Sequence, residues 1–167
     1  RTALAYDDGR FVTMRPGTGR QLAWFPEPVG AYDCYPAASP GPLLLHEVFT
    51  SASRVTVRTS ANRRDRLTSR LPMLTPPHPE GGVGAVRVEV RGASATGARE
   101  TIIAGVAEMV GTAAAATAVA YAELADAGKL RAGGVVPGDE RDDTVAILTS
   151  IERFGVRLQE FTGVPTR

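Results

Sequence analysis

Residues 83–92 alternate apolar and charged side chains, and this pattern limits what the chain can fold into. The alternating residues, in chain order, are Val86, Arg87, Val88, Glu89, Val90 and Arg91. A period of two places the valines on one face of a strand and the charged residues on the other. The segment therefore predicts a long strand with a buried valine face and a charged face in water. A turn over residues 92–97 and a returning strand over 100–110 would complete a hairpin.

The N-terminal part of the chain predicts shorter strands. Two alternating runs flank Asp7-Asp8-Gly9, and Asp-Gly is a favoured pair for a tight hairpin turn, so residues 3–14 predict a β-hairpin. Three further segments predict strands: 21–25, 31–37 and 54–58. Residues 43–49 are compatible with a strand or a short helix.

Three segments predict helices. Ser60 or Asn62 is expected to cap a helix that runs to about residue 74, before a proline-rich stretch. Thr112 is expected to cap an alanine-rich helix to about residue 127, with Gly128 as its stop. The third helix spans residues 144–154, and its expected apolar face carries Val145, Leu148 and Ile151. Residues 156–161 predict a closing strand.

The order of these elements predicts an α+β fold. Strands come first, then a helix, two long strands, two helices and a last strand, without the regular alternation of a doubly wound sheet. The expected architecture is an antiparallel or mixed β-sheet covered by helices on one face. A length of 167 residues fits one domain over residues 1–167 with a core of ordinary size.

Composition narrows the classes of partner. The 19 basic and 18 acidic residues nearly cancel, so no overall field attracts nucleic acid or an anionic membrane. Nearly all the basic residues are arginine, which grips carboxylates through two parallel hydrogen bonds and suits an amino-acid-like substrate. Cys34 is the single cysteine, so no internal disulfide forms, and we expect a cytoplasmic protein.

Neither a phosphate cradle nor a metal site is indicated. Two segments, Gly17-Thr18-Gly19 and Gly82-Val83-Gly84, each give half of a Gly-x-Gly-x-x-Gly motif, and neither lies between a strand and a helix. The two histidines, His46 and His78, lack ligands at metal-binding spacing. We expect turn glycines and no metal.

Polar residues in predicted loops and turns are candidates for substrate binding. Tyr32, Asp33 and Tyr35 are clustered, and their side chains could hydrogen-bond an imine or a carboxylate. Arg99 follows the turn between the long strands and could anchor a substrate carboxylate. For each group the alternative is structural, namely a small aromatic cluster and a solvated charge. Cys34 and His46 form a conceivable nucleophilic pair, against the simpler interpretation of a packed thiol.

The second half of the chain resembles the C-terminal domain of saccharopine dehydrogenase-like oxidoreductases. The residues that carry the resemblance are the strand 86–92, Gly97, Gly111-Thr112 with the alanine-rich helix, and Gly134-Val135-Val136-Pro137. The segment Trp24-Phe25-Pro26-Glu27-Pro28-Val29-Gly30 resembles the start of that domain, and it adds Glu27 to the candidate substrate-binding residues. The resemblance extends over residues 22–163. The helix departs from the family pattern at Thr117-Ala118-Val119-Ala120, where relatives carry Thr-Gly and a proline.

The resemblance implies a substrate-binding and dimerisation domain. Members of the family have a fold related to the C-terminal domain of glyceraldehyde-3-phosphate dehydrogenase-like enzymes, preceded by a Rossmann domain that this chain lacks. They oxidise or reduce a C–N bond of an amino-acid-derived substrate. NAD or NADP would then be bound by the full-length protein and not by this fragment, which would be inactive alone. The resemblance also implies a homodimer through the sheet, and it assigns no catalytic residue.

Two other functions stay open at this stage. The chain could be a non-catalytic ligand-binding or protein-interaction module of the same fold. It could also be a small cofactor-independent enzyme that works through Cys34 or Tyr35, which would require a pocket around those residues.

Overall fold

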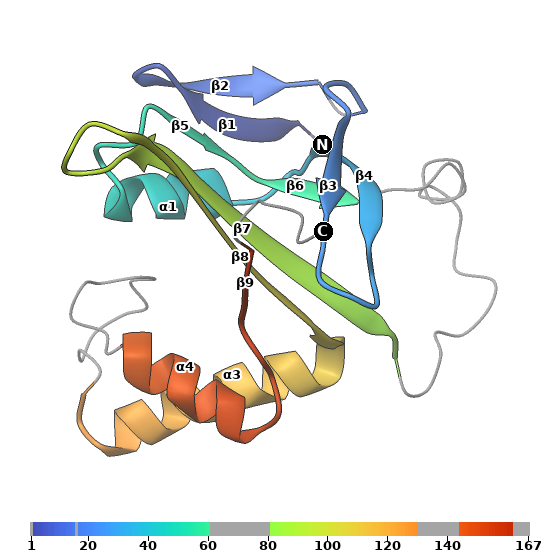
Figure 1. Cartoon of the computed structure of the whole chain (residues 1–167), viewed down its shortest axis with the longest axis vertical. Helices are drawn as coiled ribbons and strands as arrows, with labels where there is room; N and C mark the ends of the chain where they lie inside the picture. The colour runs from blue at the N-terminus through green and yellow to red at the C-terminus, as the bar shows by residue number, and fades with distance from the viewer. Residues whose placement is uncertain (1, 16, 61–80, 130–143, 162–167) are drawn as a thin grey trace. The chain divides into compact units, whose positions relative to one another are not determined.

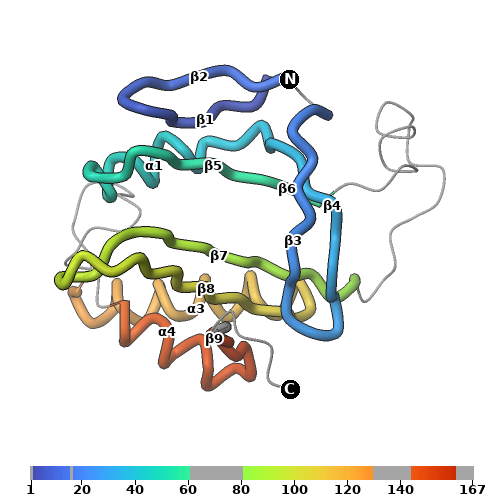
Figure 2. The backbone as a smooth tube through the Cα atoms, turned by 45° about the horizontal axis from the view of Figure 1, so that its top comes forward, coloured from blue at the N-terminus to red at the C-terminus, as the bar shows by residue number. Residues whose placement is uncertain are grey.

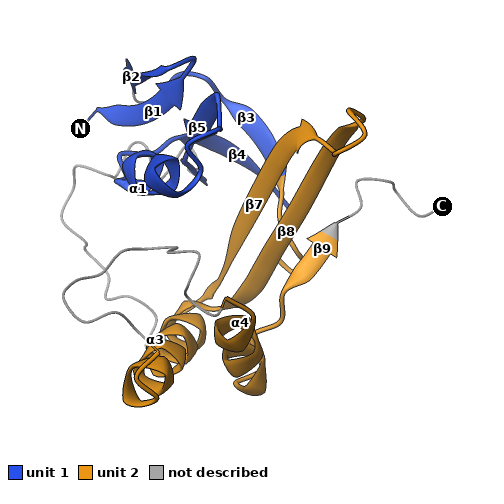
Figure 3. Cartoon of the chain, turned by 90° about the vertical axis from the view of Figure 1, so that its left-hand side faces the viewer, with its two compact units in different colours: residues 1–23, 31–75, 131–142 blue, residues 24–30, 76–130, 143–167 orange. Residues whose placement is uncertain are grey.

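The computed structural model describes residues 2–15, 17–60, 81–129 and 144–161, arranged in two compact units (Figures 1 and 3). Unit 1 comprises the described residues of 1–23 and 31–60, and unit 2 those of 24–30, 81–129 and 144–161. The predicted α+β class is confirmed. Among the described residues, three small antiparallel sheets of three strands each stand in place of the predicted single sheet. The expectation of one domain over residues 1–167 stays a prediction, because compact units can belong to one cooperative domain.

The first sheet of unit 1 begins with the predicted hairpin. Strands β1 (Ala3–Asp7) and β2 (Arg10–Met14) pair antiparallel, with β5 (Arg54–Thr56) on the other side of β1. Asp8 and Gly9 both have positive φ, 47° and 85°, as a two-residue turn of this kind requires. Helix α1 (Gly41–Val48) packs against β1 and β5, which settles the ambiguity of residues 43–49 in favour of a helix. Pro42 stands in the first turn of α1, where its missing N–H costs nothing.

The second sheet of unit 1 has the strand order β3-β4-β6. Its strands are β3 (Gln21–Trp24), β4 (Ala31–Pro36) and β6 (Arg58–Ser60). The single strand predicted over residues 54–58 is therefore divided, and β5 and β6 belong to different sheets. Val57 lies between them, and its carbonyl accepts a hydrogen bond from the N–H of Ala37 at 3.0 Å. The helix predicted over residues 62–74 lies outside the described residues.

The long hairpin of unit 2 matches the prediction in position. Strands β7 (Val83–Ala93) and β8 (Arg99–Met109) pair antiparallel over eleven residues each (Figure 2). The turn is closed by the N–H of Ser94 donating to the carbonyl of Ala98 at 2.8 Å, and Gly97 takes a φ of 80°. Strand β9 (Gln159–Phe161) adds to the free side of β8 and is shorter than the predicted strand 156–161.

The faces of β7 are the reverse of those predicted. The valines on one face, Val86, Val88 and Val90, are 66%, 55% and 56% exposed. On the other face, the side chains of Arg87 and Glu89 are only 18% and 16% exposed. Alternation fixes which residues share a face, but it does not determine which face the rest of the molecule covers. The charged face is therefore covered around Arg87 and Glu89, whereas Arg91 on the same face is 71% exposed.

Part of this cover is a proline ring on the charged face. Gly105 in β8 lies opposite Arg87, and a Cβ atom there would come within 2.9 Å of Pro26 Cγ and 3.0 Å of the Val86 carbonyl oxygen. Pro26 is fully buried although it is distant in the sequence. Residues 24–30 thus contribute to the packing of unit 2.

The two helices of unit 2 pack against each other. Helix α3 (Val110–Asp126) buries Ala116, Ala120 and Leu124, and α4 (Thr144–Arg153) buries Ile147 and Ser150. Ala120, Leu124 and Ile147 form the core of the pair, with Ala146 and Ile151 against it. No helix within the described ranges is long and apolar enough to cross a membrane.

The ends of α3 and the buried face of α4 can be compared with the sequence predictions. Helix α3 begins two residues before Thr112, with Met109 at the N-cap and no side-chain cap, so the predicted Thr112 cap is wrong. The predicted stop is confirmed, because Gly128 has a φ of 66° and the N–H of Lys129 reaches the carbonyl of Leu124 at 2.9 Å. In α4 the predicted apolar face is displaced, since Val145 is 74% exposed and Ile147 is buried.

Replacing Leu124 by alanine tests the helix-pair core. We expect Leu124→Ala to lower the free energy of unfolding by about 2–5 kcal/mol, because it leaves a cavity among buried side chains. Val145→Ala is the matched control on the facing helix, and its exposure predicts no loss. Urea denaturation of both variants measures the difference, and equal effects would contradict the assigned core.

Adding a methyl group at Gly105 tests the contact with Pro26. Gly105→Ala should destabilise by about 1–3 kcal/mol, because the new Cβ would overlap the proline ring and a backbone carbonyl. Gly92→Ala, on the paired strand, is the control: a Cβ there meets nothing within 4 Å. Thermal unfolding should show a lower Tm for the first variant and an unchanged or higher Tm for the second.

Candidate functional site

The charged face of the β7–β8 hairpin holds an open pocket with a volume of about 520 Å³. Its lining comes from both strands near the turn: Arg87, Glu89, Arg91, Gly92, Arg99, Glu100, Thr101 and Ile103. Opposite residues of an antiparallel pair lie on the same face of the sheet. The register places Arg99 opposite Ala93 and Thr101 opposite Arg91, so both belong to the face that carries Glu89.

Glu89 pairs with two of the arginines that line this pocket. Its carboxylate forms an ion pair with Arg87 at 2.6 Å through Oε2 and a second with Arg91 through Oε1. Partial burial opposes ionisation of Glu89, but the hydrogen bonds from the two arginines outweigh it and lower its pKa from the ordinary 4.5. Glu89 is thus held as a carboxylate that fixes two guanidinium groups side by side.

Arg99 is the cation of this pocket that the network leaves available. Among the described residues no ion pair forms with its guanidinium group, whereas Arg87 and Arg91 share Glu89. The Thr101 hydroxyl lies in the same lining. A guanidinium and a hydroxyl on one rigid hairpin can together hold a carboxylate or a similar planar anion.

Sequence reasoning identified Arg99 and missed the neighbours that complete the pocket. Arg87, Glu89 and Arg91 were assigned only to a solvated strand face, and Thr101 only to the returning strand. The signal was present in the alternation, because once the turn fixes the register, all four share a face with Arg99.

The other predicted site residues lie elsewhere in the chain. Tyr32, Asp33 and Tyr35 belong to β4 in unit 1, and Glu27 belongs to the segment 24–30 of unit 2. The Asp33 carboxylate lies 3.4 Å from Arg20, and the side chains of Arg20 and Asp33 are 68% and 40% exposed. The described contacts do not gather these residues into one site, and their role in substrate binding stays a prediction.

Cys34 and His46 have different environments. Cys34 is 2% exposed in β4, which fits the packed thiol. His46 lies in α1, where its ring stacks on Tyr6 with centroids 3.7 Å apart and meets the edge of Phe11. Neither Cys34 nor Tyr35 lines either of the two pockets described in this section. A cofactor-independent reaction through those two residues gains no support.

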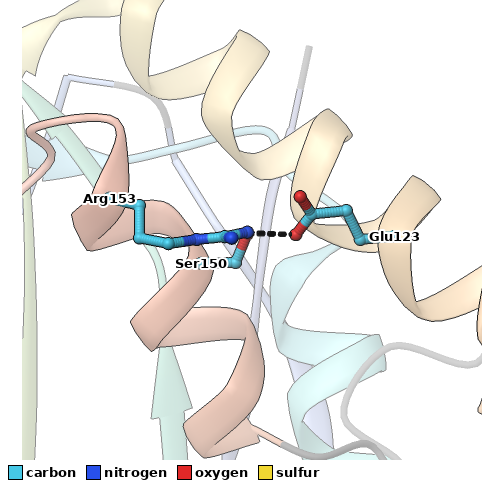
Figure 4. A network of polar contacts seen from close by, with 3 residues as sticks. All are labelled: Glu123, Ser150 and Arg153. Carbon is cyan, nitrogen blue, oxygen red and sulfur yellow. Dashed lines mark hydrogen bonds and ion pairs between the residues drawn. The ribbon is translucent and has the colours of Figure 1, made fainter.

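A second polar cluster joins the helices of unit 2 (Figure 4). Glu123 on α3 accepts hydrogen bonds from the Ser150 hydroxyl at 2.7 Å and from Arg153 at 2.5 Å, both on α4. Arg153 also donates to the Ser150 oxygen at 3.0 Å. The bonds from Ser150 and Arg153 lower the pKa of Glu123 from its ordinary 4.5. A hollow of about 400 Å³ adjoins the cluster. Glu123 Oε2 accepts from both Ser150 and Arg153, so the triad links α3 to α4.

The lowered pKa of Glu123 makes the stability of the helix pair depend on pH. A carboxylate with a lower pKa in the folded state stabilises that state above its unfolded pKa. This contribution is lost as the pH falls from 4.5 through the lowered value. Glu123→Gln should therefore be less stable than the parent at neutral pH, and the difference should shrink in acid.

Glu152→Gln, a change at an exposed glutamate on the facing helix α4, is the control for this experiment. Urea denaturation of the three proteins at a series of pH values measures the effect. A pH-independent difference between Glu123→Gln and the parent would contradict the role assigned to the Glu123 carboxylate.

Within residues 2–15, 17–60, 81–129 and 144–161, no group of three or more histidine, cysteine or carboxylate side chains could hold a metal ion. The glycines of the two half-motifs occupy a turn, where Gly17 and Gly19 have positive φ, and the start of β7. Neither segment leads from a strand into a helix, as a dinucleotide cradle would. The chain matches no protein-family model and no curated protein.

Proposed function

We propose that this chain is the substrate-binding and dimerisation domain of an NAD(P)-dependent oxidoreductase that acts on a C–N bond of an amino-acid-derived substrate. The observation that carries the proposal is the pocket on the β7–β8 hairpin, where Arg99 lines a hollow beside a fixed arginine–glutamate–arginine network. The saccharopine dehydrogenase-like sequence features supply the reaction class. They include the same hairpin that holds the pocket.

The pocket suits the carboxylate of an amino-acid-like substrate. Its volume lies in the range of small-molecule sites, and its lining has more cationic than anionic side chains. Glu89 neutralises part of the positive charge of Arg87 and Arg91. An anionic substrate would therefore be attracted mainly to Arg99. A carboxylate bound there would be oriented by two hydrogen bonds from one guanidinium group.

The reducing or oxidising step would need parts that this chain does not supply. In the proposal a Rossmann domain of the full-length cytoplasmic protein binds NAD or NADP, and this domain provides the substrate wall and the contact between two copies. Glu27, Tyr32, Asp33 and Tyr35 remain proposed contributors to that wall. Neither nucleic acid nor a membrane is a partner in this proposal.

Binding of a small dicarboxylic amino acid tests the pocket directly. Titration with L-glutamate, followed by backbone NMR, should perturb residues around Arg99 and Thr101. Arg99→Gln should weaken this binding at least about tenfold, because a charge-assisted bidentate hydrogen bond is lost. Arg157→Gln, an exposed arginine outside the pocket lining, should bind like the parent.

The reaction class is tested separately by titrating NADH and NADPH against this chain and against the full-length protein. Fluorescence should show binding by the longer protein only, and that form should oxidise NAD(P)H with the right keto acid and amine. Absence of binding by both would overturn the oxidoreductase proposal.

A second candidate function has its own observation. The exposed valine face of β7 is an apolar strip of the kind found at protein interfaces, which favours a non-catalytic interaction module. Carboxylate binding at Arg99 with no nucleotide binding by the longer protein would support a ligand-binding module instead of an enzyme.

A further inference from the structure

Strand β7 forms an edge of its sheet among the described residues. Strand β8 occupies the middle of the sheet and β9 the other edge. Eleven residues without a proline are long for an edge strand, and an unpaired edge is a template for another strand. The sequence of β7 itself restricts which strand can pair with this edge.

Symmetry restricts how β7 can pair with a second copy of itself. An antiparallel pair of identical strands is related by a two-fold axis perpendicular to the sheet. The same face of both copies then lies on the same side of the combined sheet. Opposite residues share a face, so a residue can lie opposite its own copy or opposite residues an even number of positions away. Each allowed register is thus centred on one residue.

The charges of β7 select among these registers. Centred on Val88, the pairing places Arg87 opposite Glu89 of the second copy, and by symmetry the same pair forms again. Centred on Glu89, it places Glu89 opposite itself and Arg87 opposite Arg91. Centred on Arg87, it places Arg87 opposite itself. Centred on Val90, it places Glu89 opposite Arg91, so the charges favour the registers centred on Val88 and on Val90. Opposite charges across strands stabilise a sheet and like charges destabilise it.

Length selects the Val88 register from these two. Val88 is the midpoint of β7, so centring on it pairs all eleven residues. Centring on Val86 or Val90 pairs only residues 83–89 or 87–93. The Val88 register also keeps the valines together, with Val86 opposite Val90 and Val88 opposite its copy, and β-branched neighbours across strands pack well.

We propose that two copies of this chain pair through β7, antiparallel and centred on Val88, to form one continuous six-stranded sheet. We infer a second copy of the chain as the partner of this edge strand, because one register both pairs the whole length of β7 and places Arg87 of each copy opposite Glu89 of the other. The inference specifies the homodimer of the proposed function and rests on that part of it alone, not on the chemistry of the pocket.

Single cysteine substitutions read the register directly. In the proposed dimer the two Val88 Cα atoms are about 4.5–5.5 Å apart, which suits a disulfide. Val88→Cys should form a covalent dimer under mild oxidation. Val86→Cys and Val90→Cys should not, because each lies about 13 Å along the strand from its own copy. Mixing the Val86→Cys and Val90→Cys chains should restore cross-linking, because those positions lie opposite each other.

The parent chain controls for Cys34, whose burial should leave it unreactive. Cross-linking of Val86→Cys or Val90→Cys with itself would assign another register and overturn the proposal. Equal cross-linking at all three positions would show non-specific contact, and no cross-linking at any would show that the edge is not the interface. Each of these results is independent of carboxylate or nucleotide binding.

Charge reversal gives a second test that needs no disulfide. Arg87→Glu should raise the dimer dissociation constant at least about tenfold, since it replaces two attractive cross-strand pairs by two repulsive ones. Adding Glu89→Arg to that variant exchanges the signs and should restore the dimer. Sedimentation measures both, with circular dichroism as the check on folding. A monomeric parent chain, or a double variant no better than the single one, would overturn the inference.

Discussion

The register of the β7–β8 hairpin is the constraint on which the rest of unit 2 depends. Eleven consecutive pairs, from Val83 opposite Met109 to Ala93 opposite Arg99, fix which side chains share each face. A slip of one residue would exchange the two faces completely. The hairpin turn at Ser94–Gly97 and the close approach of Pro26 to Gly105 both hold this register. The pocket and the valine strip are the two faces that result.

The two faces illustrate what a sequence pattern can and cannot predict. The alternation of residues 86–91 correctly predicted a strand and its partition into faces, because strand geometry is local. It predicted the wrong face to be buried, because cover comes from elements elsewhere in the chain. Pro26 precedes Gly105 of β8 by 79 residues, and nothing in the local sequence around Pro26 indicates that the two will lie together.

The same division holds in the rest of the molecule. The Asp8-Gly9 turn and the stop at Gly128 were predictable, since each depends on the conformational preference of one or two residues. The stacking of His46 on Tyr6 was not, because it joins a helix and a strand forty residues apart. In the candidate site, Arg99 was identified singly, and its neighbours emerged only from pairing across the hairpin. Helix α4 was placed correctly, but its buried face depends on α3 and was not.

The contact between Pro26 and Gly105 also determines how this protein can be divided. Unit 2 takes residues 24–30 from within the part of the chain that otherwise builds unit 1. A fragment starting at residue 81 would contain β7, β8, α3, α4 and β9, yet it would leave the space above Gly105 open to water. Recombination at that boundary would separate a hairpin from the ring that packs on it. Unit 2 is therefore not a continuous segment that can be moved to another chain with its packing intact.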